Sequence, residues 1–241
     1  MRIDIWSDVV CPFCYLGKQR LDAALRQWQH ADAVEIVWHS FELDPHASRE
    51  SSESLAEHIA TKYGTSLAQS EASQEALAEQ FAAEGGLRFN WRTAKPGNTF
   101  DAHRVFHYAV EQGVGEVVMG ALMRAYFSEG APVADRASVA RVAAEAGLDA
   151  EAVAHVLDSE AYAAAVRDDE AQAREIGISG VPFFVFDGRL AVSGAQPTEV
   201  FLQALTQAWE TRKPQLMSVG GADQAPSCGP DGCETPTTSA G

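Results

Sequence analysis

Two cysteines stand three residues apart in the segment DVVCPFCYLG, residues 8–17. Thiols at this spacing can hold a metal ion, close a structural disulfide or exchange electrons with another disulfide. The chain has 4 cysteines in two close pairs, Cys11 with Cys14 and Cys228 with Cys233. The long separation of the pairs is unlike a framework of structural disulfides, and a four-thiolate zinc site would need two ligands from a flexible tail. We therefore expect no metal site.

The role of each thiol in the first pair follows from a helix that is predicted to begin at Cys11. A thiol at a helix start faces unpaired N–H groups and the positive end of the helix dipole, which favour the thiolate and lower its pKa. Cys11 is therefore the expected nucleophile. Cys14 lies one turn later, where it can attack a mixed disulfide on Cys11 and release the substrate. The alternative is a pair of core cysteines, because free cysteine is often buried.

A second candidate site lies in SGVPFF, residues 179–184. A Val181–Pro182 step directly before a strand suits a cis peptide bond, because cis bonds in folded proteins are nearly always found before proline. Such a turn would expose the backbone of Val181 to pairing with an extended peptide. The alternative is a trans proline that opens an edge strand.

The second cysteine pair stands in the tail sequence SCGPDGCE. The residues between the cysteines, GPDG, are typical of a type I turn, which would bring Cys228 and Cys233 to disulfide distance. About fourteen residues separate Pro214 from Cys228, and they reach roughly 45–50 Å when extended. A tail disulfide can therefore reach the first pair and exchange with it. The alternative is an isolated pair that oxidises adventitiously.

Other candidates carry weaker signals. Asp8 could accept a proton from the dithiol, although an acid at a strand end is more typical of a helix cap or the surface. His103 and His107 stand four residues apart on a predicted helix without a third ligand, so we expect surface or packing positions rather than a metal site. Lys18 is expected to be a solvated charge on its helix.

The surrounding pattern predicts the elements that position these residues. The expected elements are strands at 2–7 and 34–41 around a helix at 11–30, helices through 44–175, a hairpin of 181–186 and 189–194, and a last helix at 198–213. This order indicates an α/β domain made of residues 1–43 and 176–213, with a helical domain of residues 44–175 inserted into it. Residues 214–241 are rich in Gly, Pro, Ser and Thr, and this composition predicts a flexible tail.

The net charge and the distribution of apolar residues limit the classes of partner and the compartment that we expect. The formal net charge is −16, which disfavours nucleic acid and anionic membranes as partners. The N-terminus has no apolar signal segment, and no apolar run is long enough to span a membrane. We therefore expect a cytoplasmic protein, and disulfides that persist in the cytoplasm are uncommon.

The CPFC and VP motifs together, with helices between them, resemble the thioredoxin superfamily and its DsbA-like branch. Within that branch, WSDVVCPFCYLGKQRL and NTFDAHRVFHYA (98–109) are similar to the FrnE subfamily. The resemblance implies a thioredoxin fold, a Cys11–Cys14 redox pair and a Val181–Pro182 loop that binds substrate. It also implies no cofactor beyond the disulfides themselves, an external thiol reductant such as glutathione, and disulfide-containing or misfolded proteins as substrates.

These observations predict a cytoplasmic thiol–disulfide oxidoreductase that acts as a reductase or isomerase. Two alternatives stay open. The related kappa-type glutathione-dependent isomerases and transferases share the architecture, but they typically have serine where Cys11 stands and lack the second thiol. The other alternative is a chaperone-like holdase in which the cysteines are secondary.

Overall fold

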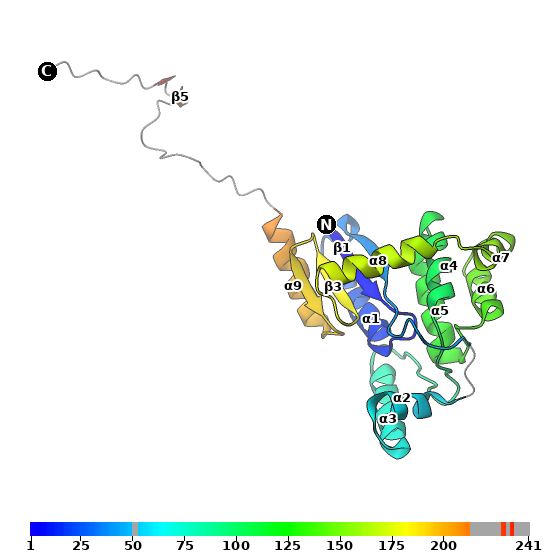
Figure 1. Cartoon of the computed structure of the whole chain (residues 1–241). Coiled ribbons are helices and arrows are strands. Elements are labelled where there is room, and N and C mark those ends of the chain that lie inside the picture. Colours follow the sequence, from blue (N-terminus) through cyan, green and yellow to red (C-terminus); the bar gives the residue numbers. More distant parts are fainter. Residues whose placement is uncertain (50–52, 213–227, 230–231, 234–241) are drawn as a thin grey trace.

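The computed structural model describes residues 1–49, 53–212, 228–229 and 232–233 (Figure 1). Its strands are β1 (Arg2–Ser7), β2 (Glu35–Ser40), β3 (Phe183–Phe186), β4 (Leu190–Ser193), β5 (Cys228–Gly229) and β6 (Gly232–Cys233). Its helices are α1 (Pro12–Gln27), α2 (Leu55–Tyr63), α3 (Leu67–Ala83), α4 (Phe100–Glu111), α5 (Gly115–Glu129), α6 (Arg136–Glu145), α7 (Ala150–Asp158), α8 (Ala163–Glu175) and α9 (Thr198–Thr211), with a short 3-10 helix η1 (Ala31–Ala33) after α1. The predicted order of a βαβ unit, a run of helices and a ββα unit is confirmed.

The strands from β1 to β4 form one mixed sheet in the order β2-β1-β3-β4. β1 and β2 are parallel, whereas β3 is antiparallel to both of its neighbours, β1 and β4. Alternation along β1 places Ile3 and Ile5 in a core with α1 and α9, and Trp6 on the opposite face with Ala173 of α8. The sheet is therefore covered by helices on both faces, which confirms the α/β class (Figure 1).

Helix α1 begins where the sequence predicts, with Cys11 as its N-cap residue and a proline in its first turn. Its buried positions include Leu16 and Leu21, which belong to the same hydrophobic core as Ile3 and Ile5 of β1. A glycine at position 17 allows a close approach to the hairpin, because a Cβ there would lie 3.1 Å from both Pro182 and Phe184. This contact brings the start of α1 against the loop that contains Pro182.

The predicted helix of residues 11–30 is too long at its C-terminal end. Trp28 is already extended, with φ −99° and ψ 128°. The indole of Trp28 packs edge-on against the indole of Trp209 in α9, with ring centroids 5.3 Å apart. The ring of His30 stacks on Trp209, with centroids 4.2 Å apart. This aromatic contact with α9 explains why the chain leaves the helix before His30.

The helices between β2 and β3 form two groups in Figure 1: α2 and α3 lie together below the sheet, and α4 to α7 lie beside it. Capping boxes start α2 at Ser54 and α3 at Ser66, and the side chain of Asp149 caps α7. The last helix of this region, α8, packs on the sheet beside β2. The division into domains at 43/44 and 175/176 stays a prediction.

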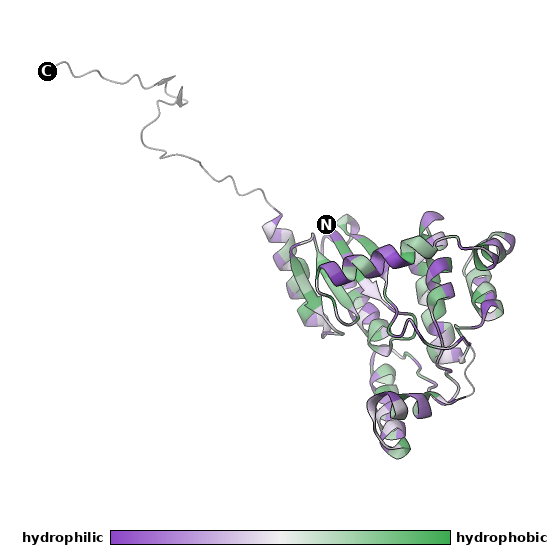
Figure 2. Ribbon diagram, viewed as in Figure 1, coloured by the Kyte–Doolittle hydropathy of each residue, from purple (hydrophilic) through white to green (hydrophobic). Residues whose placement is uncertain are grey.

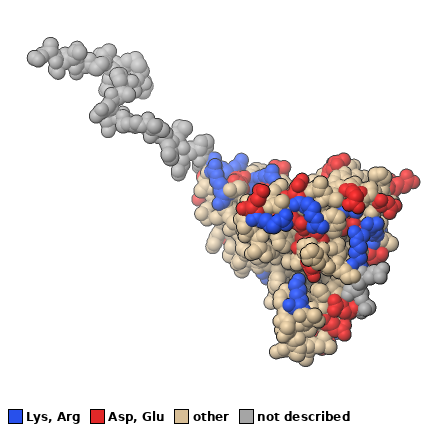
Figure 3. All heavy atoms as spheres, in the orientation of Figure 1, with Lys and Arg blue, Asp and Glu red and all other residues tan. Residues whose placement is uncertain are grey.

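Hydrophobic residues gather along the strands and on the helix faces turned toward them, and hydrophilic residues lie on the outer faces (Figure 2). On the face in Figure 3, acidic and basic side chains lie side by side. Acidic side chains on this face therefore have basic neighbours, although the chain as a whole is acidic. None of the helices in the described residues combines the length and hydrophobicity that crossing a membrane requires.

Strands β5 and β6 are a short antiparallel pair in which Cys228 stands opposite Cys233. The two central residues of the predicted GPDG turn and the remainder of the predicted tail lie outside the described residues. The predicted disulfide between these cysteines and its exchange with the first pair therefore stay predictions.

Candidate active site

Cys11 and Cys14 meet at the start of α1, directly after the loop that follows β1. Both are free thiols, and their residues are only 3% and 1% exposed. The backbone N–H of Cys14 points at the Cys11 sulfur at 3.4 Å, and the Cys11 thiol donates to the carbonyl of Val181 at 3.5 Å. A backbone donor aimed at the Cys11 sulfur stabilises negative charge there.

The Val181–Pro182 bond is cis, as the sequence predicts. The Pro182 carbonyl accepts the N–H of Gly194 at 2.9 Å, which fixes the loop against the end of β4. Among the described residues, the N–H of Val181 has no hydrogen-bond partner, and its carbonyl is met only by the Cys11 thiol. The loop therefore places an unpaired backbone N–H, and a carbonyl whose one partner among the described residues is the Cys11 thiol, beside the redox pair.

The two thiols lie in different environments. Burial raises the pKa of the Cys14 thiol well above its ordinary value, and the hydrogen bond and charge of the adjacent Cys11 raise it further. Cys11, in contrast, lines an open groove on the surface. The arrangement suits attack by Cys11 on an incoming disulfide and a later, internal attack by Cys14.

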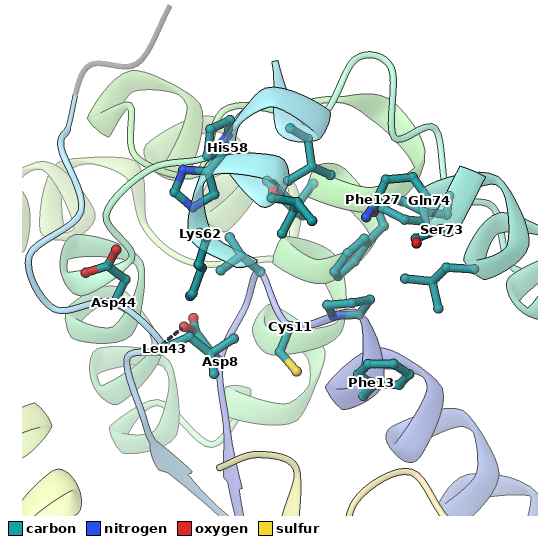
Figure 4. A pocket seen from close by; sticks show the side chains of 18 of the residues that line it. Asp8, Cys11, Phe13, Leu43, Asp44, His58, Lys62, Ser73, Gln74 and Phe127 are labelled. Atoms are coloured by element: carbon teal, nitrogen blue, oxygen red, sulfur yellow. Dashed lines mark hydrogen bonds between the residues drawn. The ribbon is translucent and has the colours of Figure 1, made fainter. Parts of the chain in front are cut away.

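The groove in front of Cys11 has a volume of about 770 Å³. One wall is formed by Cys11, the half-exposed ring of Phe13 and the Val181 loop, and the other by α2 and α3. In Figure 4, His58 and Lys62 of α2 lie across the groove from the Cys11 sulfur. Neither the groove nor the position of these two side chains in it was predicted, because α2 is far from the CPFC motif in the sequence.

Asp8 is not the surface or capping residue that the sequence favoured. It is 1% exposed, and one carboxylate oxygen accepts the N–H of Leu43 at 2.8 Å (Figure 4). The other oxygen lies 3.3 Å from Nε2 of His103. The predicted surface position of Asp8 was wrong because the loop after β1 turns inward, where Asp8 meets the segment after β2. His103 is a fully buried packing residue with a carboxylate partner.

His107 lies one turn further along α4, where its Nε2 is 3.1 Å from both Ser40 Oγ and a carboxylate oxygen of Asp169. Asp169 also contacts His39 at 2.8 Å and accepts the backbone N–H of Ser40 at 2.7 Å. Burial alone would raise the pKa of Asp169, but the hydrogen bonds from His107, His39 and Ser40 lower it to about 2. Sequence reasoning missed Asp169, because nothing in the run RDDEAQ marks which acid is buried.

Lys18 is also not the solvated charge that the sequence favoured. Its side chain is 13% exposed, and its ammonium group contacts Asp22 at 2.8 Å and Glu116 of α5 at 2.9 Å. Lys18 therefore ties α1 to α5. Within the described residues, no group of three or more His, Cys, Asp or Glu side chains is arranged to hold a metal ion.

The NTFDAHR stretch contains an arginine, Arg104, whose role in packing could not be predicted from residue spacing. Arg104 is 1% exposed and pairs with Asp101 at 2.8 Å. Its guanidinium also donates to the carbonyls of Val156, Ser159 and Ala161, beyond and at the end of α7. This arginine joins α4 to α7, and the same helix turns His103 toward Asp8 beneath the redox pair.

Comparisons with known proteins agree with this geometry. The Bacillus subtilis protein YwbO is 27% identical over 208 residues, which cover 86% of this chain and 96% of YwbO. A probable DsbA oxidoreductase from Streptomyces coelicolor is 44% identical in its crystal structure, with a TM-score of 0.84, and the match covers 98% of this chain and 99% of that one. The cytosolic disulfide reductase DsbM from Pseudomonas aeruginosa, at 19% identity and a TM-score of 0.60, shares the fold over 88% of this chain and 100% of its own.

A family model described as a DSBA-like thioredoxin domain matches residues 2–206. The match begins at β1 and ends within α9, so it includes the CPFC motif, the inserted helices and the VP motif in one alignment. It confirms the thioredoxin fold with helices inserted between its βαβ and ββα halves. The chain belongs to the DsbA-like thioredoxin domain family.

Proposed function

We propose that this protein is a thiol–disulfide oxidoreductase that reduces or isomerises disulfides in other proteins. The observation that carries the proposal is the pairing of Cys11, at the mouth of an open groove, with Cys14, buried directly behind it. A nucleophile that lines a groove, with a second thiol one turn away, is the arrangement that disulfide exchange requires. Membership of the DsbA-like family supports the same reaction class.

In the proposed reaction, the Cys11 thiolate attacks one sulfur of a substrate disulfide. A mixed disulfide forms on Cys11, and the other substrate sulfur leaves as a thiolate that takes a proton from water. Val181 and Pro182 serve as the substrate-binding loop, because the free N–H and the carbonyl of Val181 can pair with an extended peptide. Cys14 then attacks Cys11, which releases the reduced substrate and leaves a Cys11–Cys14 disulfide.

An external thiol returns the Cys11–Cys14 disulfide to the dithiol, and glutathione is the proposed example. The cytoplasm is the proposed compartment, in keeping with the cytosolic reductase that shares the fold. A reducing compartment favours net reduction or isomerisation of substrates over net oxidation. The expected partners are disulfide-containing or misfolded proteins, and the acidic charge argues against nucleic acid and membranes.

The second pair, Cys228 and Cys233, is proposed to exchange with Cys11 and Cys14. The antiparallel register of β5 and β6 sets the two cysteines opposite each other, which supports a disulfide between them. In the exchange, a Cys11 or Cys14 thiolate attacks the tail disulfide, so the tail gains two electrons and the first pair is oxidised; the reverse reaction runs when the tail is the dithiol.

The test is insulin reduction and reactivation of scrambled ribonuclease, with wild type compared with Cys11→Ser and Cys14→Ser. We expect turnover in wild type and none in Cys11→Ser. If a Cys11→Ser, Cys14→Ser double variant suppresses aggregation as well as wild type, and wild type reduces no disulfide, the holdase is favoured. Tight glutathione binding with turnover of an aromatic small molecule would instead favour a kappa-type enzyme.

A further inference from the structure

Three buried polar side chains line the groove in front of Cys11 without a partner inside the protein. Gln74 of α3 is 7% exposed, Thr99 is 3% exposed and Tyr126 of α5 is 2% exposed, and all three line the groove. Figure 4 shows Gln74 among the lining side chains. Within residues 1–49 and 53–212, none of the three side chains makes a hydrogen bond. We call these three side chains the polar floor of the groove.

The neighbours of the polar floor show that pairing inside the protein is possible on this wall of the groove. Ser70 stands one turn before Gln74 on α3 and also lines the groove, but its hydroxyl donates to the carbonyl of Ala56 at 2.8 Å. Thr99 is the N-cap residue of α4, where a threonine hydroxyl usually accepts a backbone N–H, yet it makes no such bond. Buried polar groups nearly always have partners, because their lost hydration is otherwise not replaced. The partner of the polar floor is therefore expected in the groove.

The polar floor is uncharged at neutral pH and can both donate and accept hydrogen bonds. The Gln74 amide has two N–H donors and a carbonyl acceptor, and each hydroxyl both donates and accepts. Burial raises the pKa of the Tyr126 hydroxyl far above neutrality, and the charge of Asp8 raises it further, so the hydroxyl keeps its proton. The polar floor therefore matches a ligand group that carries a donor and an acceptor but no charge.

The surroundings of the polar floor also favour an uncharged ligand group. Many of the side chains that line the groove are apolar, and the buried rings of Phe89 and Phe127 are among them. The Asp8 carboxylate is already held by the N–H of Leu43, and Lys62 is exposed and not part of the floor. A charged group on the floor would lose its hydration without gaining an opposite charge. A peptide group, with one N–H and one C=O, meets the requirement.

We propose that the polar floor binds main-chain peptide groups of the substrate segment that carries the disulfide. The Val181 loop lines the same groove, so an extended segment would be held by this loop and by the inserted helices together. The substrate class is then a disulfide in an extended chain segment, recognised through its main chain. Small disulfides without peptide groups do not use the floor. This inference rests on the proposed function, and it gives the inserted helices a part in substrate binding.

The test compares two disulfides with the same coloured leaving group, using the full-length dithiol protein. One is a synthetic linear peptide whose cysteine is joined to 2-nitro-5-thiobenzoate, and the other is 5,5′-dithiobis(2-nitrobenzoate), which has no peptide group. In Gln74→Leu we expect the KM for the peptide disulfide to rise roughly 10-fold, as loss of one hydrogen bond predicts, with kcat nearly unchanged. The rate with 5,5′-dithiobis(2-nitrobenzoate) should stay as in wild type.

Two further readouts separate substrate binding from a structural role. The amide of Gln74 has no partner in the free protein, so Gln74→Leu should raise the melting temperature while it weakens binding, and Tyr126→Phe should act in the same way. Methylation of single peptide nitrogens along the probe should raise the wild-type KM at one position. At that position it should have a smaller effect in Gln74→Leu, because the two changes remove the same hydrogen bond.

The matched control is Ser70→Ala, which removes a hydroxyl that is bonded inside the protein. It should lower the melting temperature and leave the kinetics with both disulfides as in wild type. The inference is overturned if Gln74→Leu lowers the melting temperature and leaves the KM for the peptide unchanged, or if it slows both disulfides equally. If Gln74→Leu does not fold, Tyr126→Phe decides by the same measurements. A wild type that reduces no protein disulfide contradicts the proposed function instead.

Discussion

Cys14 is 1% exposed, and burial is the main reason why the pKa of its thiol lies well above the ordinary value. Cys11 lines the groove and receives the Cys14 N–H. We therefore expect iodoacetamide at mildly acidic pH to label Cys11 well before Cys14, with each site followed by mass spectrometry. Protein unfolded in urea is the control, where the two thiols should react at similar rates. Faster labelling of Cys14 in the native protein would reverse the two assigned roles.

The contact between α1 and β3 depends on one missing methyl group, at Gly17. An alanine Cβ there would lie 3.1 Å from side-chain atoms of both Pro182 and Phe184. We expect Gly17→Ala to cost about 1–3 kcal/mol of unfolding free energy, as overpacking does, and to slow insulin reduction because the Pro182 loop is displaced from Cys11. Urea unfolding and the reduction rate measure the two effects.

Gly120→Ala is the matched control for Gly17→Ala. Gly120 also lies inside a helix, α5, but the nearest atom to an added Cβ is the flexible end of Lys18, 3.8 Å away. Alanine should therefore stabilise that helix by roughly 0.5–1 kcal/mol. Equal stabilisation by both substitutions would mean that the α1–β3 contact is not tight.

Asp169 joins α8 to β2 and α4 through His39, His107 and Ser40. The lowered pKa of Asp169, about 2, means that its contribution to stability is present above the unfolded pKa and is lost as the pH falls from about 4 toward 2. Burial opposes a charge on His39, but hydrogen bonds to Asp169 and Asp4 raise its pKa. The His39 contribution is therefore full below about pH 6.5 and is lost as the pH rises through the raised value.

We expect Asp169→Asn to lower the unfolding free energy by about 3–5 kcal/mol near pH 6, the cost of breaking a buried ion pair from one side. It should also weaken both limbs of the stability profile, which urea unfolding between pH 3 and pH 9 measures. Glu145→Gln, which removes an exposed partner of Arg141, should change the profile little. A profile in Asp169→Asn that runs parallel to wild type would show that the cluster does not set the pH dependence.

The elements that the sequence predicts well are those whose signals are local. The period-two pattern of residues 2–7 gives β1, and the serine- and aspartate-type caps act within one turn, as at Asp149. The end of α1 is different, because it depends on Trp28 meeting Trp209 of α9. A boundary that is set by a partner far along the chain leaves no local pattern.

The candidate site divides in the same way. CPFC and VP are short motifs whose chemistry can be read from residue type and spacing, and the structure places Cys11 beside Val181. Asp8, Lys18 and Asp169 could not be placed, because a carboxylate or an ammonium group is expected at the surface unless the groups that pack around it are known. The groove depends on how α2 and α3 fold back over the thiols, which no local pattern specifies.

For the whole molecule, the four-stranded sheet and its core are complete by the end of α9 at Thr211. Closing a loop as short as that between Cys228 and Cys233 removes little chain entropy. We therefore expect truncation after Pro214 to leave the melting temperature nearly unchanged but to alter the rate of disulfide exchange. Stepwise reduction with mass-spectrometric mapping of each pair compares the two forms. Independent titration of the tail pair, with unchanged reduction and isomerase rates after truncation, would make the tail an appendage.

In the proposed reaction, Cys11 attacks substrate disulfides and Cys14 resolves the mixed disulfide that forms. The most direct measurement is to incubate Cys14→Ser with insulin, quench with acid and locate the adduct by peptide mass spectrometry, with Cys11→Ser as the control. We expect an insulin chain disulfide-bonded to Cys11 in Cys14→Ser and no adduct at position 14 in Cys11→Ser. Absence of an adduct on Cys11, or equal adducts on whichever thiol remains, would contradict it.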